Sequence, residues 1–242
     1  MELKIIHFYP DLMSLYGSYA NVSVLRRALE QMGNTVTVTR VDPGQTADLT
    51  GADFLFMGAG TEKRQKFALS DFVRFAPDIK AAAGSGTAML FAGTAMELLG
   101  SRIVDAGGKA CDGIGLGSFT STQGKQRIVG DVYGATDLYS GAVVGFMNKC
   151  STISGVETPL LTSLALGFGN EAQGGAEGFR HKNVLGSHLT GPILVKNPRL
   201  LDAVITAIYE KRGQAVPQLP RDEYAEQGYA VTAQALKERC GK

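Results

Sequence analysis

Glycine-rich strand ends and a few cysteines and histidines are the residues of this sequence that could do chemistry. Gly58-Ala59-Gly60 ends the apolar run 52–57, and a backbone N–H at such a turn can face an anion. Cys150 follows Lys149, whose positive charge would favour a reactive thiolate. Neighbouring side chains on an extended chain point to opposite faces, however. The pattern therefore favours an anion-facing turn and an inert thiol over a cysteine nucleophile at position 150.

The cysteines and histidines show no metal-binding or disulfide pattern. The three cysteines lack C-x-x-C spacing, and the histidines show no H-E-x-x-H spacing, so the sequence predicts no metal and no disulfide framework. No G-x-G-x-x-G follows the first apolar run, which argues against a dinucleotide cofactor. The residues concerned are His7, His181 and His188, and Cys111, Cys150 and Cys240.

The first hundred residues alternate between strand and helix patterns. Because strands that alternate with helices form a largely parallel sheet, we expect such a sheet with helices on both faces. Pro77 predicts a bend in the second helix. The expected strands are Glu2–Tyr9, Thr35–Val41, 52–57 and 88–92, and the expected helices are Asn21–Met32, Lys63–Ala83 and Ala95–Leu99.

The second half of the chain is rich in Gly, Thr and Val between residues 101 and 190. Short β-like runs at 126–132, 141–146 and 163–166 are expected to complete the same sheet. Helical patterns return at Asn197–Lys211 and Asp222–Arg239. We therefore predict a single domain over residues 1–212 and a C-terminal helical extension over residues 213–242.

Composition limits the classes of function. The 242 residues carry 24 Lys and Arg against 23 Asp and Glu, so no basic surplus would attract nucleic acid. No apolar run approaches the ~20 residues that span a bilayer, and no signal-peptide pattern opens the sequence. The sequence predicts a cytoplasmic protein that binds no nucleic acid and is not an integral membrane protein.

Several motifs follow one another in a family's order over residues 1 to about 212. They resemble class I glutamine amidotransferases of the cobyric-acid-synthase-like branch, above all the glutaminase subunit of lipid II isoglutaminyl synthase. The most diagnostic stretch is Gly191-Pro192-Ile193-Leu194-Val195-Lys196-Asn197-Pro198. The other motifs are Tyr9-Pro10-Asp11-Leu12-Met13-Ser14-Leu15-Tyr16-Gly17 with Asn21-Val22, Phe56-Met57-Gly58-Ala59-Gly60 with Gln65, Gly113-Ile114-Gly115-Leu116-Gly117, Arg127-Ile128-Val129-Gly130-Asp131, Gly145-Phe146-Met147-Asn148, Gly167-Phe168-Gly169-Asn170, and Asn183-Val184-Leu185-Gly186-Ser187-His188.

The resemblance implies a fold and an activity. The fold is a flavodoxin-like α/β fold, with a mostly parallel central sheet flanked by helices and a β-rich second half. The activity is hydrolysis of glutamine to ammonia, without a cofactor, for a Mur-ligase-like amidating partner in a heterodimer that modifies the D-glutamate of the lipid II stem peptide. Such chemistry needs a cysteine thiolate on a strand-to-helix turn, a histidine and backbone oxyanion donors.

The catalytic residues implied by the resemblance are missing. The nucleophile position falls on Gly93, and the position of the histidine before Gly-Pro falls on Thr190. His188 lies two residues earlier, either as a displaced base or as a hydrogen-bonded structural histidine. Of the acidic-Asn-His segment that the family carries after Gly145-Phe146, only Asn148 remains.

Other parts of the implied site are retained. Gly58, Ala59, Gly60 and Thr94 would supply oxyanion N–H groups, and Arg127 would gate or hold glutamine, unless it is an exposed strand arginine. We therefore predict an amidotransferase-like subunit without glutaminase activity. The alternatives are an active glutaminase with relocated catalytic residues and an amino-acid sensor that binds glutamine in the old pocket.

Overall fold

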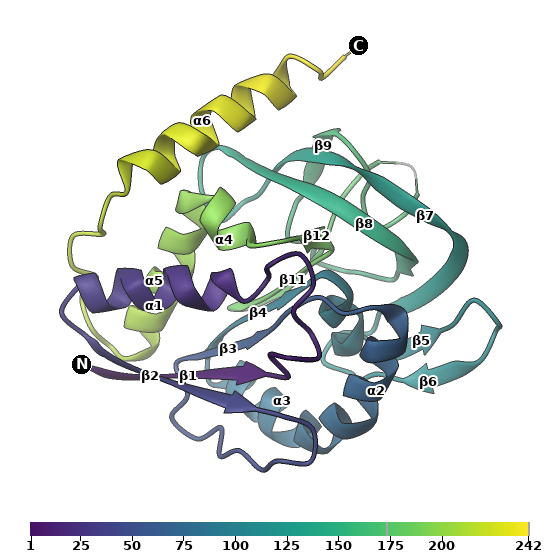
Figure 1. Cartoon of the computed structure of the whole chain (residues 1–242), viewed down its shortest axis with the longest axis horizontal. Coiled ribbons are helices and arrows are strands. Elements are labelled where there is room, and N and C mark those ends of the chain that lie inside the picture. Colours follow the sequence, from purple (N-terminus) through teal and green to yellow (C-terminus); the bar gives the residue numbers. More distant parts are fainter. Residues whose placement is uncertain (173, 242) are drawn as a thin grey trace.

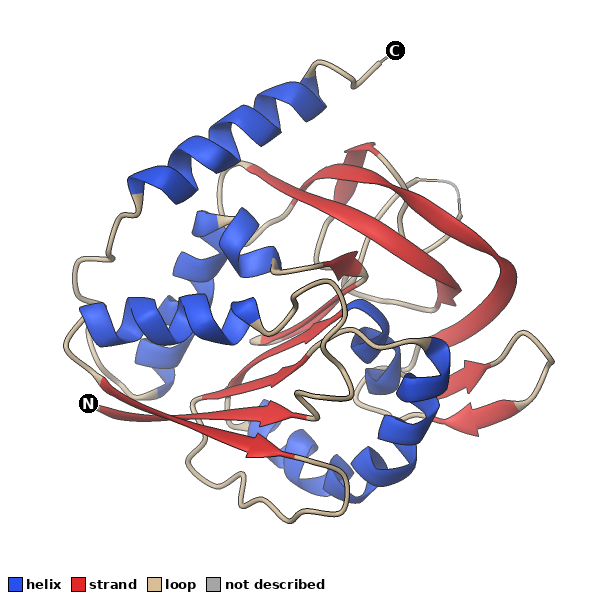
Figure 2. Ribbon diagram, in the orientation of Figure 1, coloured by secondary structure: helices blue, strands red, loops and turns tan. Residues whose placement is uncertain are grey.

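The protein contains two sheets with helices packed around the first of them (Figures 1 and 2). The structure is a computed structural model that describes residues 1–172 and 174–241. The first sheet, called the central sheet here, has the order β10-β11-β4-β3-β1-β2. All its neighbouring strands are parallel except the β10–β11 pair. Its strands are β1 (Glu2–Phe8), β2 (Thr35–Val41), β3 (Phe54–Met57), β4 (Ala88–Ala92), β10 (Phe179–His181) and β11 (Val184–Ser187).

Alternating apolar side chains divide the core between the two faces of the central sheet. Phe54 and Phe56 of β3 belong to one buried cluster and Leu55 and Met57 to the other, because successive side chains of a strand point to opposite faces. Helices α1 (Ala20–Gln31) and α5 (Pro198–Lys211) pack in the first cluster, and α2 (Glu62–Phe72), η1 (Val73–Phe75) and α3 (Ala76–Gly84) pack in the second. The predicted parallel sheet with helices on both faces is confirmed.

The second half of the chain builds a separate sheet, so the prediction that it completes the same sheet was wrong in part. Only β10 and β11 join the central sheet. The second sheet has the order β12-β8-β7-β5-β6, with β9 paired to β7, and it is mainly antiparallel. Its strands are β5 (Arg102–Val104), β6 (Ala110–Asp112), β7 (Thr120–Ala135), β8 (Ala142–Ser154), β9 (Ser163–Leu166) and β12 (Leu189–Thr190).

The C-terminal residues form a helix that lies along the second sheet (Figure 1). Helix α6 (Glu223–Lys237) begins at Asp222, whose carboxylate accepts the backbone N–H groups of Tyr224 and Ala225. Tyr229 donates its hydroxyl to the carbonyl of Ala142, 2.7 Å away. The short helix α4 (Ile193–Lys196) lies between β12 and α5 in the chain. Within the described residues no helix is both long and apolar enough to cross a membrane.

Local geometry follows the sequence closely in two of the predicted helices. The predicted bend near Pro77 is present as the 3₁₀ turn η1, and Pro77 lies in the first turn of α3, where its missing N–H costs nothing. The predicted helix after the strand 88–92 is η2 (Gly93–Leu99), a 3₁₀ helix.

We predict that protonation of the buried His7 destabilises the folded protein in acid. Burial and nearby Arg40 lower the pKa of His7 from 6.5 to about 4, so the folded protein holds it neutral. Its stability contribution is complete above pH 6.5 and is lost as the pH falls towards 4, by roughly 3 kcal/mol in all. We expect the free energy of unfolding, measured by urea titration, to fall between pH 6.5 and pH 4 in the wild type. The fall should be smaller in His7→Phe. His181→Gln, at an exposed position, is the matched control and should retain the fall.

Candidate functional site

A cavity of about 100 Å³ opens where β3 and β4 end. The carboxyl ends of parallel strands are the usual place for a binding site in such folds. All of the predicted site residues except Gly58 line this cavity, although they come from distant parts of the sequence. The lining residues are Leu15, Tyr16, Ala59, Gly60, Thr61, Glu62, Gly93, Thr94, Arg127, Asn148, Lys149, His188 and Thr190.

Gly93 is the first residue of η2 and makes the sharp turn that follows β4. Its φ is +62°, in the left-handed region that residues with a β-carbon seldom adopt. A strand, a turn with strained backbone and a helix are the geometry that presents a nucleophile in several hydrolases. Here the turn is present and the nucleophilic side chain is not.

The loop after β3 has its backbone amides bound to side-chain hydroxyls. Gly60 donates its N–H to Thr94 Oγ1 at 3.0 Å, and the Thr94 hydroxyl lies 3.0 Å from the Gly60 carbonyl oxygen. Ala59 donates its N–H to Ser18 Oγ at 3.4 Å. Gln65 donates its amide to the Thr94 carbonyl at 2.8 Å. The loop and the elbow are therefore tied to each other, and these two N–H groups point to internal partners.

A chain of polar side chains forms the rim of the cavity. Arg127 lies at the irregular stretch of β7 where its register with β8 shifts, and such bulges redirect side chains. Its guanidinium donates to Asn148 Oδ1 at 2.6 Å and to Glu62 Oε1 at 2.8 Å. Asn148 in turn donates to the Tyr16 hydroxyl at 3.0 Å. Burial tends to raise the pKa of Glu62, but hydrogen bonds from its own backbone N–H and from Arg127 bring it below its ordinary value.

Thr190 and His188 also line the cavity. The Thr190 hydroxyl donates to the Phe146 carbonyl at 3.0 Å. His188 is almost fully buried between two buried carboxylates: Nε2 lies 3.5 Å from Glu97 Oε1, and Nδ1 lies 3.6 Å from Glu177 Oε1. These separations exceed ordinary hydrogen-bond lengths, and within the described part of the chain neither ring nitrogen has a hydrogen-bond partner.

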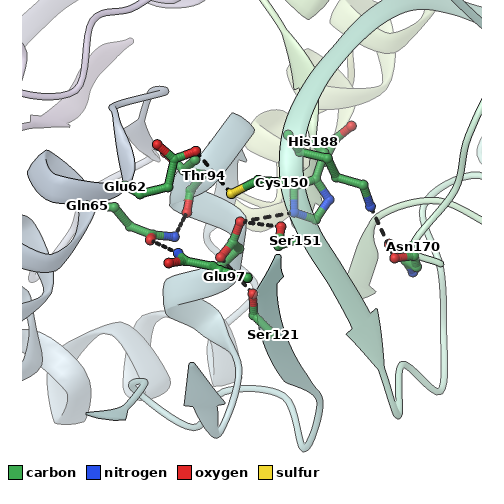
Figure 3. Close-up of polar contacts among 12 residues, drawn as sticks. Glu62, Gln65, Thr94, Glu97, Ser121, Cys150, Ser151, Asn170 and His188 are labelled. Atoms are coloured by element: carbon green, nitrogen blue, oxygen red, sulfur yellow. Dashed lines mark hydrogen bonds and ion pairs between the residues drawn. The ribbon is translucent and has the colours of Figure 1, made fainter. Parts of the chain in front are cut away.

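Glu97 organises the buried polar groups behind the cavity (Figure 3). It projects from η2 and accepts the hydroxyls of Ser121 at 2.6 Å and Ser151 at 2.7 Å. Burial alone would raise the pKa of Glu97, but the His188 imidazole and the hydrogen bonds that the carboxylate accepts lower it to about 2. Glu97 is therefore ionised at neutral pH, and we call Glu97, His188, Glu177 and Lys149 the buried charge cluster.

Lys149 is the cationic lysine of the buried charge cluster. Its ammonium donates to the carbonyls of Gly169 at 2.6 Å and Asn170 at 3.1 Å. Burial lowers the pKa of Lys149 to about 8, although the nearby glutamates act in the opposite direction. Besides His188, which the family motif singled out, the sequence signal for this cluster is an acidic residue, Glu97, within the apolar run 95–99.

Cys150 has the environment of an unreactive thiol. Its Sγ donates to Glu62 Oε1 at 3.3 Å, and burial together with that carboxylate raises the thiol pKa to about 11. A thiol with this pKa contributes almost no thiolate at neutral pH. Among the described residues, no group of three or more His, Cys, Asp or Glu side chains could hold a metal ion.

Known proteins resemble this chain in sequence over most of its length. Residues 4–198 match the CobB/CobQ-like glutamine amidotransferase domain. The chain is 28% identical to lipid II isoglutaminyl synthase (glutamine-hydrolyzing) subunit GatD of Staphylococcus aureus, over 91% of this chain and 89% of that protein. It is 31% identical to the GatD subunit of Streptococcus pneumoniae, over 92% and 86% respectively.

A solved structure of a glutamine amidotransferase has the same fold. It aligns with a TM-score of 0.54 at 16% identity, over 84% of this chain and 98% of that chain. The match of the family domain over most of the sequence, together with the elbow and its facing loop, leads to one conclusion: the chain belongs to the CobB/CobQ-like glutamine amidotransferase family.

Proposed function

We propose that this protein is a GatD-like subunit that does not hydrolyse glutamine and that supports a Mur-ligase-like amidating partner in a heterodimer. The likeness to two GatD subunits over most of both chains supports the kind of complex. Its acceptor is the stem peptide of lipid II, and its place is the cytoplasm. The nitrogen for amidation comes from free ammonia.

The observation that carries the proposal is the elbow without a side chain. Amide hydrolysis through a thioester needs a thiolate at the turn and a base that exchanges its proton. Gly93 supplies no nucleophile, and the hydroxyl of Thr190 is bound to the Phe146 carbonyl. The Thr94 hydroxyl is bound to Gly60, and Cys150 is held as a thiol by Glu62.

The remaining cavity is suited to structural support or to ligand binding without turnover. Arg127, Asn148 and Glu62 keep a polar rim that could receive an amino acid. The buried charge cluster holds η2, β8 and the β11–β12 connection together, which keeps the two sheets in fixed relative positions. Both properties are useful in a subunit that binds a partner.

A glutaminase and amidation assay tests the proposal. The protein is purified with its amidating partner, and amidated lipid II is measured with glutamine or with ammonium chloride as the nitrogen source. We expect product with ammonium only, and no glutamate released from glutamine by the protein alone or in the complex. The partner assayed alone with ammonium is the control for the contribution of this subunit.

Two outcomes would contradict the proposal. Amidation that uses glutamine, and that Arg127→Ala abolishes, would show a relocated catalytic site. Stabilisation of the isolated protein by millimolar glutamine, with no effect of the protein on its partner, would favour an amino-acid sensor.

A further inference from the structure

The methyl group of Ala59 occupies the space next to the elbow that a side chain at position 93 would need. A β-carbon built on Gly93 would lie 2.6 Å from Ala59 Cβ and 3.3 Å from Ala59 Cα. Carbon atoms that are not bonded pack at about 3.5–4.0 Å, so the shorter separation is a severe overlap. The clash involves a backbone-attached methyl, which cannot rotate away.

The loop that carries Ala59 is fixed from several sides. The Ala59 carbonyl accepts the N–H of Leu15 at 2.9 Å, and the Ala59 N–H is bound to Ser18. On one side of Ala59, a β-carbon at Gly58 would lie 2.5 Å from the Met13 carbonyl oxygen. On the other side, Gly60 is hydrogen-bonded to Thr94. Relief of the clash by movement of the loop would break these contacts.

We infer that Ala59 is a second determinant that excludes a nucleophilic side chain from the elbow, in addition to the absence of a side chain at Gly93. The inference deepens the proposed function and rests on its assignment of position 93 as the nucleophile position. It assigns Ala59 a steric role: a cysteine returned to position 93 would not fit until residue 59 is glycine.

Two separate effects must be distinguished in the test. Any residue other than glycine at position 93 is strained because φ is positive, whatever space is available. Gly213 separates the effects: its φ is +63°, nearly the same as at Gly93, and nothing lies within 4 Å of the β-carbon it would carry. Gly213→Ala therefore measures the backbone strain without the clash.

The experiment is a thermal-unfolding cycle on the full chain with Gly93→Ala, Ala59→Gly, the double variant and Gly213→Ala. Alanine adds only the β-carbon that meets Ala59. We expect Gly93→Ala to lower Tm by roughly 5–10 °C more than Gly213→Ala does. Ala59→Gly should lower the Tm of the wild type slightly but raise the Tm of the Gly93→Ala variant. The cysteine variants Gly93→Cys and Ala59→Gly/Gly93→Cys should show the same order.

Additivity would overturn the inference. If Ala59→Gly lowers Tm equally in the wild type and in the Gly93→Ala variant, the two positions do not compete for space. If Gly93→Ala is insoluble but the double variant is soluble, the result supports the inference. If both variants are insoluble, the result contradicts it, because removal of the Ala59 methyl group then does not relieve the defect. The cycle is independent of the glutaminase assay, so the wild type could prove to hydrolyse glutamine while the steric competition stands, or the reverse.

Discussion

Glu97→Ala is expected to lower the free energy of unfolding by about 3–5 kcal/mol at pH 7, because it removes one partner from a buried group of charges. Two hydroxyls would lose their acceptor, and His188 would face only Glu177 across 3.6 Å. Chemical denaturation followed by circular dichroism measures the loss. The variant should also make the cavity wall less rigid, because Glu97 projects from the same 3₁₀ helix that begins at Gly93.

The pH dependence of Glu97→Gln separates the charge from the packing. The folded pKa of Glu97 is about 2 and the ordinary value is 4.5, so the charge contributes its full stability above pH 4.5. This contribution is lost as the pH falls towards 2. The gap in unfolding free energy between wild type and Glu97→Gln should narrow over that window by about 3 kcal/mol. A gap that stays constant from pH 7 to pH 3 would contradict the lowered pKa of Glu97 in the folded protein.

Phe72→Ala is expected to cost about 3–5 kcal/mol of unfolding free energy through the cavity it would leave. The Phe72 ring is fully buried and meets the rings of Phe8, Tyr9 and Phe91 at centroid distances of 5.2 to 6.2 Å. Phe8 lies in β1, Phe91 in β4 and Tyr9 directly after β1, so Phe72 attaches α2 to the central sheet. Urea denaturation gives the change in unfolding free energy.

A matched control lies on the same helix. Phe67 is 57% exposed, so Phe67→Ala should change stability by only about 0.5 kcal/mol or less. Equal losses for the two variants would mean that α2 is held by something other than its buried face.

Local sequence patterns predicted which segments form strands and helices better than they predicted which strands pair with each other. The apolar runs at 52–57 and 88–92 and the bend near Pro77 follow from periodicity and from proline geometry. The second sheet could not be recognised in this way, because alternation in β7 and β8 shows that a strand exists and not which strand it will pair with. Val184–Ser187 joins β4 in the central sheet although about a hundred residues separate the two strands.

The candidate site was predictable where it depends on sequence motifs. Gly93, Thr190, Arg127 and Asn148 were identified by resemblance, and the structure places them around one cavity. The interactions that occupy the Ala59 and Gly60 amides were not predictable, because they depend on hydroxyls of Ser18 and Thr94 that lie 41 and 34 positions away. Burial of several charged groups in one cluster likewise depends on how distant segments meet.

The connection between β11 and β12 has a mechanical consequence. The chain leaves the central sheet at Ser187 and enters the second sheet at Leu189, so His188 is a one-residue joint between the two sheets. A single residue between two paired strands leaves little slack in this connection. Because His188 also lines the cavity, this joint places the connection between the two sheets at the cavity wall.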